Sequence, residues 1–207
     1  MTAASPPNQL PADRGSSEQR ASEERRLVRS RAWTRHIVPG LLFAVVAFYS
    51  LAFHYRVPYF DHWSIVPLYD ALQRGELPVG ALFELHGSHW HTSGYLVMLA
   101  NSRLTGMELW PDIVASLLIA LLGWFAISAI VERTLEELGE STSGYRRHVQ
   151  LAVAAFFWFS LDQNENWLWG WQVALFISTT GTVWAIAALH RPGLHPTNIA
   201  LAALSTV

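Results

Sequence analysis

The chain has 207 residues, of which 51% are hydrophobic and only 14% are charged, with a formal net charge of −2. Soluble domains carry about 25% charged residues, so this composition indicates a membrane protein. The absence of cysteine excludes disulfides and thiolate metal sites. All fourteen basic residues are arginines, and seven of them precede residue 36, beside an apolar segment. There they indicate membrane orientation, with no sign of nucleic-acid binding.

Residues 1–36 are polar and contain few large apolar side chains. Such a segment cannot bury enough apolar surface to offset the entropy lost on ordering. We therefore expect a disordered tail, which its arginines place in the cytoplasm.

Residues 37–207 are predicted to form one polytopic domain, an all-α integral membrane protein with about four transmembrane helices and a truncated fifth. Segments 37–55, 113–131 and 168–189 are long enough to cross a ~30 Å hydrocarbon core. Segment 147–161 spans it only if its flanking arginines snorkel to the interface. Segment 199–207 stays apolar to its end, so we expect an N-terminal portion of a longer protein.

The arginines also predict the orientation of these spans. With the N-terminus inside, alternation places 56–112 and 162–167 outside and 132–148 and 190–198 inside. The inner loops carry four arginines and the 162–167 loop carries none. These features predict a multi-pass membrane protein with a cytoplasmic N-terminus.

The long outer loop, 56–112, has helical signals of its own. Ile65, Leu68 and Leu72 repeat at helical spacing after Ser64, a potential N-cap, and Gly75 stands where that helix would end. A second short helix is expected at roughly 95–104. Both are too short to span, so we predict interfacial amphipathic helices.

Two polar clusters lie in this loop. Asp61, beside His62, could act as a base or hold a cation, or it could simply cap the following helix. His86, His89 and His91 could converge on a divalent metal, bind phosphate or face water. The sequence does not require a metal.

A third cluster, Leu161 to Gln172, reads LDQNENWLWGWQ. Its three tryptophans are typical of an interfacial belt, but a belt does not explain the polar residues. Topology places them on the same side of the membrane as Asp61 and the histidines. We therefore predict that Glu165, Asn166 and Gln172 help to form a shared outer site.

These motifs together resemble a group of bacterial polytopic membrane proteins that are similar in layout to C-type (GT-C) integral membrane glycosyltransferases. The resemblance is carried by Asp61-His62-Trp63, by His86-Gly87-Ser88-His89, and by the run from Phe159-Ser160 through Glu165-Asn166-Trp167 to Trp169-Gly170-Trp171-Gln172. Ser88 and Trp90 stand where this group is expected to carry an acid and an arginine, and a C-type transferase has more spans than this chain.

The resemblance implies a protein of the bacterial inner (plasma) membrane that transfers a sugar from polyprenyl phosphate at the outer face to a glycan or lipid acceptor. Asp61 would be the catalytic base, and His62, His86 and His89 would bind substrate, the last two through the donor phosphate. Glu165, Asn166 and Gln172 would bind the sugar or position Asp61. Two alternatives stay open: a non-catalytic membrane subunit of envelope polysaccharide assembly, and an inactive fragment. A transporter is disfavoured because the polar groups lie at one interface and not at the midplane.

Overall fold

The computed structural model describes residues 34–87, 89–139, 144–190 and 197–200. Among them, α-helices predominate, joined by short 3₁₀ turns and one small hairpin. In chain order the elements are α2 (Ile37–Phe53), η1 (Phe60–Ser64), α3 (Ile65–Arg74), η2 (Val79–Phe83), β1 (Leu85–His86), β2 (His89–Trp90), α4 (Thr92–Thr105), α5 (Trp110–Glu137), α6 (Tyr145–Trp158), η3 (Leu161–Gln163), α7 (Asn164–Leu168), η4 (Gly170–Gln172) and α8 (Val173–Leu189).

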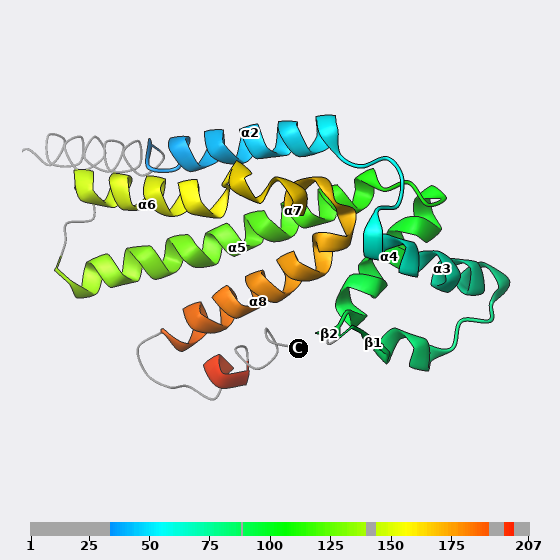
Figure 1. The fold of residues 1–207 in the computed structure, drawn as a ribbon. Helices are drawn as coiled ribbons and strands as arrows, with labels where there is room; N and C mark the ends of the chain where they lie inside the picture. The colour runs from blue at the N-terminus through cyan, green and yellow to red at the C-terminus, as the bar shows by residue number, and fades with distance from the viewer. Residues whose placement is uncertain (1–33, 88, 140–143, 191–196, 201–207) are drawn as a thin grey trace, which may run out of the picture.

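The long helices α2, α5, α6 and α8 run side by side, and α3, α4 and the hairpin lie beyond one end of this bundle (Figure 1). Helix α5 is the central element and packs mainly against α8. Gly123 permits a close approach there, because a Cβ at this position would lie 2.5 Å from Trp158 Cζ2 and 2.7 Å from Thr180 Oγ1. The Trp158 indole donates to the Ala120 carbonyl at 2.9 Å.

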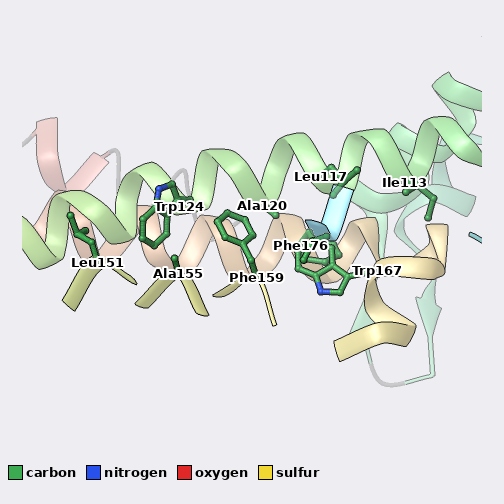
Figure 2. Packing of buried hydrophobic residues seen from close by; sticks show 10 residues of the cluster. Ile113, Leu117, Ala120, Trp124, Leu151, Ala155, Phe159, Trp167 and Phe176 are labelled. Atoms are coloured by element: carbon green, nitrogen blue, oxygen red, sulfur yellow. The ribbon is translucent and has the colours of Figure 1, made fainter. Parts of the chain in front are cut away.

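The bundle core is built from large side chains of α5, α6 and α8 together with Trp167 of α7 (Figure 2). Trp167 is 1% exposed, stacks near Phe176 with ring centroids 4.6 Å apart, and donates through Nε1 to the Ser160 carbonyl at 2.9 Å. Burying so large an apolar side chain contributes roughly 2–3 kcal/mol. The short helix α7 is thus anchored in the core and is more than a connecting loop.

The expected helices of the outer segment are both present. Helix α3 ends at Gly75, whose φ of 71° is the left-handed conformation that favours glycine, but Ser64 makes no side-chain cap. Helix α4 is longer at both ends than the predicted 95–104 segment. A second core cluster, which includes Ile65, Met98 and Trp171, joins these helices to the start of α8. The segment 56–112 is therefore packed onto the bundle through α3 and α4.

The predicted spans are confirmed only in part. Within the described residues, two helical runs are long and apolar enough to cross a membrane, Trp110–Glu137 and Gly170–Leu189, in agreement with membrane association. Helix α2 is apolar but has 17 residues, and α6 has 14 and ends before residue 161. Residues 201–207 of the expected fifth span and 1–33 of the expected tail lie outside the described residues.

Candidate functional site

The hairpin places two predicted site histidines opposite each other. His86 on β1 pairs with His89 on β2 across a turn that contains Gly87, whose φ is +61°. Directly opposed residues of an antiparallel pair point to the same face. His91 follows two residues after His89, and its ring centroid lies 5.5 Å from that of His86 and 6.4 Å from that of His89. The three imidazoles therefore form one cluster.

Trp171 is the aromatic support of this cluster. It is 4% exposed, and its ring centroid lies 5.0 Å from His86 and 5.1 Å from His91. Tyr95 of α4 also packs near it, with ring centroids 5.8 Å apart. Trp171 therefore packs against two of the three imidazoles.

Asp61 faces the histidine cluster from η1. Its Oδ2 atom lies 3.6 Å from His86 Nε2, and its side chain is 53% exposed. The preceding residue, Phe60, has a φ of 46°, which is unusual for a residue with a side chain and indicates local backbone strain. The Phe60 ring is largely exposed and contacts Tyr59, with ring centroids 4.6 Å apart. Tyr59 in turn packs on Trp169 at 5.7 Å, so the turn that presents Asp61 contacts the W-G-W segment, Trp169 to Trp171.

These groups line a pocket of ≈ 450 Å³. Its wall combines one carboxylate, three imidazoles, two indoles and an amide, from Asp61, His86, Gly87, His89, His91, Trp169, Trp171 and Gln172. Four of the predicted site residues, Asp61, His86, His89 and Gln172, are therefore brought together from segments far apart in the sequence. Hydrogen-bonding groups beside aromatic faces are suited to a small polyhydroxylated ligand.

A second hollow, a groove of ≈ 550 Å³, adjoins this pocket. It shares His89, His91, Trp171 and Gln172 with the pocket and continues along α8 past Leu175, Ile177, Ser178 and Thr182. From Gln172 to Thr182 an α-helix rises about 15 Å. The groove therefore leads from the histidine cluster along the wall of a helical run that is long and apolar enough to cross a membrane.

Beneath Trp171 lies a buried polar pair that does not belong to the pocket lining. His62 and Asp112 are 2% and 1% exposed, with His62 Nε2 3.7 Å from Asp112 Oδ2, farther apart than a hydrogen bond. Burial lowers the pKa of His62 to about 4, so its imidazole is neutral at pH 7. Asn101 donates through Nδ2 to Asp112 Oδ1 at 2.7 Å. His62 is thus a packed support residue, in contrast to its predicted role in substrate binding.

The polar half of the third motif lies elsewhere. Glu165 and Asn166 are on α7 and line neither the pocket nor the groove. The Asn166 amide donates to Gln163 Oε1 at 3.4 Å, and the Leu168 carbonyl accepts from the Tyr55 amide at 3.0 Å. The backbone turns at Trp169, so the residues before it lie toward α2 and those after it toward the histidines.

The tryptophans of this motif do not form an interfacial belt. Trp167 and Trp171 are buried in two different core clusters, and Trp169 packs on Tyr59 with ring centroids 5.7 Å apart. Gly170 lies between them against the buried pair: a Cβ there would be 2.9 Å from Asp112 Cβ and 3.2 Å from His62 Cε1. The segment from Trp167 to Trp171 therefore connects the bundle core to the site.

Metal binding receives no geometric support from this cluster. Within the described ranges, no group of three His, Cys, Asp or Glu side chains is arranged to hold a metal ion. Two ring nitrogens of lining residues, His91 Nδ1 and Trp169 Nε1, are buried without a hydrogen-bond partner. Because both atoms are buried, neither is presented to a ligand in the pocket.

His91 has a perturbed proton affinity. Burial lowers its pKa, and the neighbouring His86 and His89 lower it further, whereas Asp61 acts in the opposite direction. His91 is therefore largely neutral at neutral pH, and an anion placed against the cluster would draw a proton onto it.

Several residues of this region were not predicted to form the site. Trp169, Trp171 and Asp112 belong to it or support it, and His91 was predicted only as part of a histidine cluster that could bind a metal or phosphate or face water. The dipeptide Gly87-Ser88 between two histidines is a hairpin signal that would have placed His86, His89 and His91 on one face. The acid of Trp-Pro-Asp before the apolar α5 segment is typical of a helix start, and nothing in that pattern indicates its burial.

Comparison with known proteins gives no family assignment: no protein-family model, no curated protein and no solved structure matches this chain.

Proposed function

We propose that this chain is the N-terminal part of a glycosyltransferase-like protein of the inner membrane, which takes a sugar from polyprenyl phosphate at the outer face. The observation that carries the proposal is that a pocket with one carboxylate and three imidazoles continues into a longer groove along α8. The groove begins at His89 and His91 and passes Leu175, Ile177, Ser178 and Thr182. A lipid-linked sugar, whose head group is joined to a long tail, fits a pocket that continues along a helical run long and apolar enough to cross a membrane.

A multi-pass arrangement is supported by the surface of the bundle. Large apolar side chains are exposed on all four long helices, for example Phe48 on α2, Phe125 on α5, Phe157 on α6 and Ile186 on α8. Exposed apolar surface of this extent needs a cover, and lipid is the cover that fits four parallel helices. On this proposal α2 and α6, although short, also lie within the bilayer.

Arginines at one end of the bundle support the proposed orientation. Arg35 pairs with Glu132 at 2.8 Å, and Arg147 contacts Glu136 at 3.3 Å, at the end of the bundle away from α3 and α4. Arg133 donates to the Ala187 carbonyl at this same end. Arginines favour the cytoplasmic side, so the pocket faces outward.

In the proposed reaction Asp61 acts as general base. It accepts the proton of the acceptor hydroxyl, whose oxygen attacks the anomeric carbon of the sugar while the bond from that carbon to the phosphate oxygen breaks. Polyprenyl phosphate leaves with the bonding electrons. His86, 3.6 Å from Asp61, positions the carboxylate, and Trp171 and Gln172 contact the sugar.

The test is transfer from a labelled polyprenyl-phosphate sugar by the full-length protein in membranes. Asp61→Asn should reduce the transfer rate about 10²- to 10⁴-fold, the usual contribution of a general base. Glu165→Gln is the matched control, because Glu165 is an exposed acid on the same proposed side but outside the pocket.

Undiminished transfer by Asp61→Asn would remove the catalytic assignment. Binding of the lipid-linked sugar without any transfer by the wild type would instead favour the non-catalytic subunit.

A further inference from the structure

The pocket and the groove meet at a junction formed by four residues that line both. His89, His91, Trp171 and Gln172 border both hollows, whereas Asp61 and His86 border only the pocket, and Leu175 and Thr182 only the groove. In a lipid-linked sugar the phosphate lies between the sugar and the lipid. If the sugar occupies the pocket and the lipid the groove, the phosphate falls at this junction.

We propose that His91, with His89, binds the phosphate of the lipid-linked substrate at this junction, where the polar pocket meets the groove. The inference rests on the proposed function. It changes the assignment made from the sequence, in which His86 and His89 met the phosphate, because His86 faces Asp61 at 3.6 Å. His86 then positions the base, Asp61, and His91 binds the phosphate.

The surroundings of His91 support an anion at this position. Its side chain borders both hollows, and because its Nδ1 atom is buried, the other ring nitrogen, Nε2, is the one that an anion would contact. His91 is also the N-cap residue of the 14-residue helix α4, and no side chain caps that helix. The first turn of a helix leaves backbone N–H groups free and carries partial positive charge, which favours phosphate. Ser93, in that first turn, lines the groove.

The charges around His91 agree with this assignment. The imidazoles of His86 and His89 lie beside it, and Tyr95 and the Trp171 face complete its surroundings. Asp61 is the only carboxylate among the described residues of the pocket lining, and it sits on the His86 side. A phosphate at the junction would therefore meet the imidazoles of His89 and His91, whereas the carboxylate of Asp61 contacts His86.

Binding of defined probes to the full-length protein in detergent tests the proposal by calorimetry. The probes are a ten-carbon prenyl phosphate, the prenyl alcohol of the same length, and inorganic phosphate. The wild type should bind the prenyl phosphate more tightly than the alcohol. His91→Ala should weaken binding of the prenyl phosphate roughly 10- to 100-fold, the range for a hydrogen bond to a charged group, and leave binding of the alcohol unchanged.

Controls separate this effect from damage to the fold. His91→Gln keeps an amide donor and should weaken phosphate binding less than His91→Ala. His54→Ala removes a histidine outside both hollows and should bind all probes as the wild type does. Inorganic phosphate should bind far more weakly than the prenyl phosphate, because it makes no contact with the groove; equal affinities would show a free-phosphate site and overturn the lipid-linked assignment.

Equal binding of prenyl phosphate by wild type and His91→Ala would overturn the inference, as would equal binding of phosphate and alcohol by the wild type. These outcomes are distinct from failure of the proposed function. Sugar transfer that depends on Asp61 but not on His91 removes only the phosphate assignment. Phosphate binding that depends on His91, without sugar transfer, removes only the transferase.

Discussion

Replacement of Gly170 by alanine should destabilise the protein, because this glycine lies against the buried polar pair under the site. The added Cβ would be 2.9 Å from Asp112 Cβ, 3.2 Å from His62 Cε1 and 3.5 Å from Asp112 Oδ2. Neither neighbour can move freely: both are almost completely buried, and Asn101 holds Asp112. Overpacking of this kind costs about 1–3 kcal/mol.

The measurement is thermal unfolding in detergent at a fixed heating rate, followed by the loss of helical circular dichroism. For a chain of this size each kcal/mol corresponds to about 2–4 °C in the midpoint, so a decrease of several degrees is expected. Gly80→Ala is the matched control, because a Cβ at Gly80 would meet no atom within 4 Å. If Gly170→Ala unfolds at the wild-type midpoint, the close packing of the W-G-W turn on His62 and Asp112 is refuted.

Two further predictions concern the buried histidine and the topology. Burial lowers the pKa of His62 to about 4, below its ordinary value of 6.5. Between these values the imidazole binds a proton in the unfolded chain and not in the folded one, so the contribution of His62 to stability should be complete above about pH 6.5 and should fall toward pH 4 by on the order of 3 kcal/mol. The measurement is the difference between the unfolding midpoints of the wild type and His62→Asn from pH 4 to 7, which should shift in favour of the variant as the pH falls; a difference that does not change with pH would contradict this assignment. For the topology, single cysteines at Glu84 and Asn164, both exposed, should react with an impermeant thiol reagent added from outside to intact cells, since the chain has no other cysteine. Reaction at only one of the two positions would contradict a shared outer face.

The sequence predicted the helical class and part of the helix plan because long apolar runs and helix-ending glycines are local signals. The 113–131 segment lies inside α5, and Gly75 ends α3 as expected. The 147–161 segment was predicted to extend beyond the end of α6, which is at Trp158. Hydropathy reports the length and composition of an apolar run, and it does not report the residue at which the helix ends.

The site was predicted less evenly than the fold. Asp61, His86, His89 and Gln172 share one pocket, as their common side of the membrane indicated. Glu165 was expected to help to form the shared outer site, but it lies on α7, before the turn at Trp169, and lines neither the pocket nor the groove. That turn depends on burial of Trp167 and Trp171 in separate clusters. Such tertiary packing cannot be read from spacing alone.

Photolabelling tests the central claim most directly, namely that a lipid-linked substrate lies along α8 with its head among the histidines. The probe is a prenyl phosphate with a diazirine on the isoprene unit next to the phosphate, applied to the full-length protein in membranes. We expect labelled peptides to contain the α8 residues that line the groove, from Leu175 to Thr182. Labelling would contradict the claim if it fell instead on the separate apolar hollow of ≈ 290 Å³ between α2 and α5, at Phe43 and Phe125.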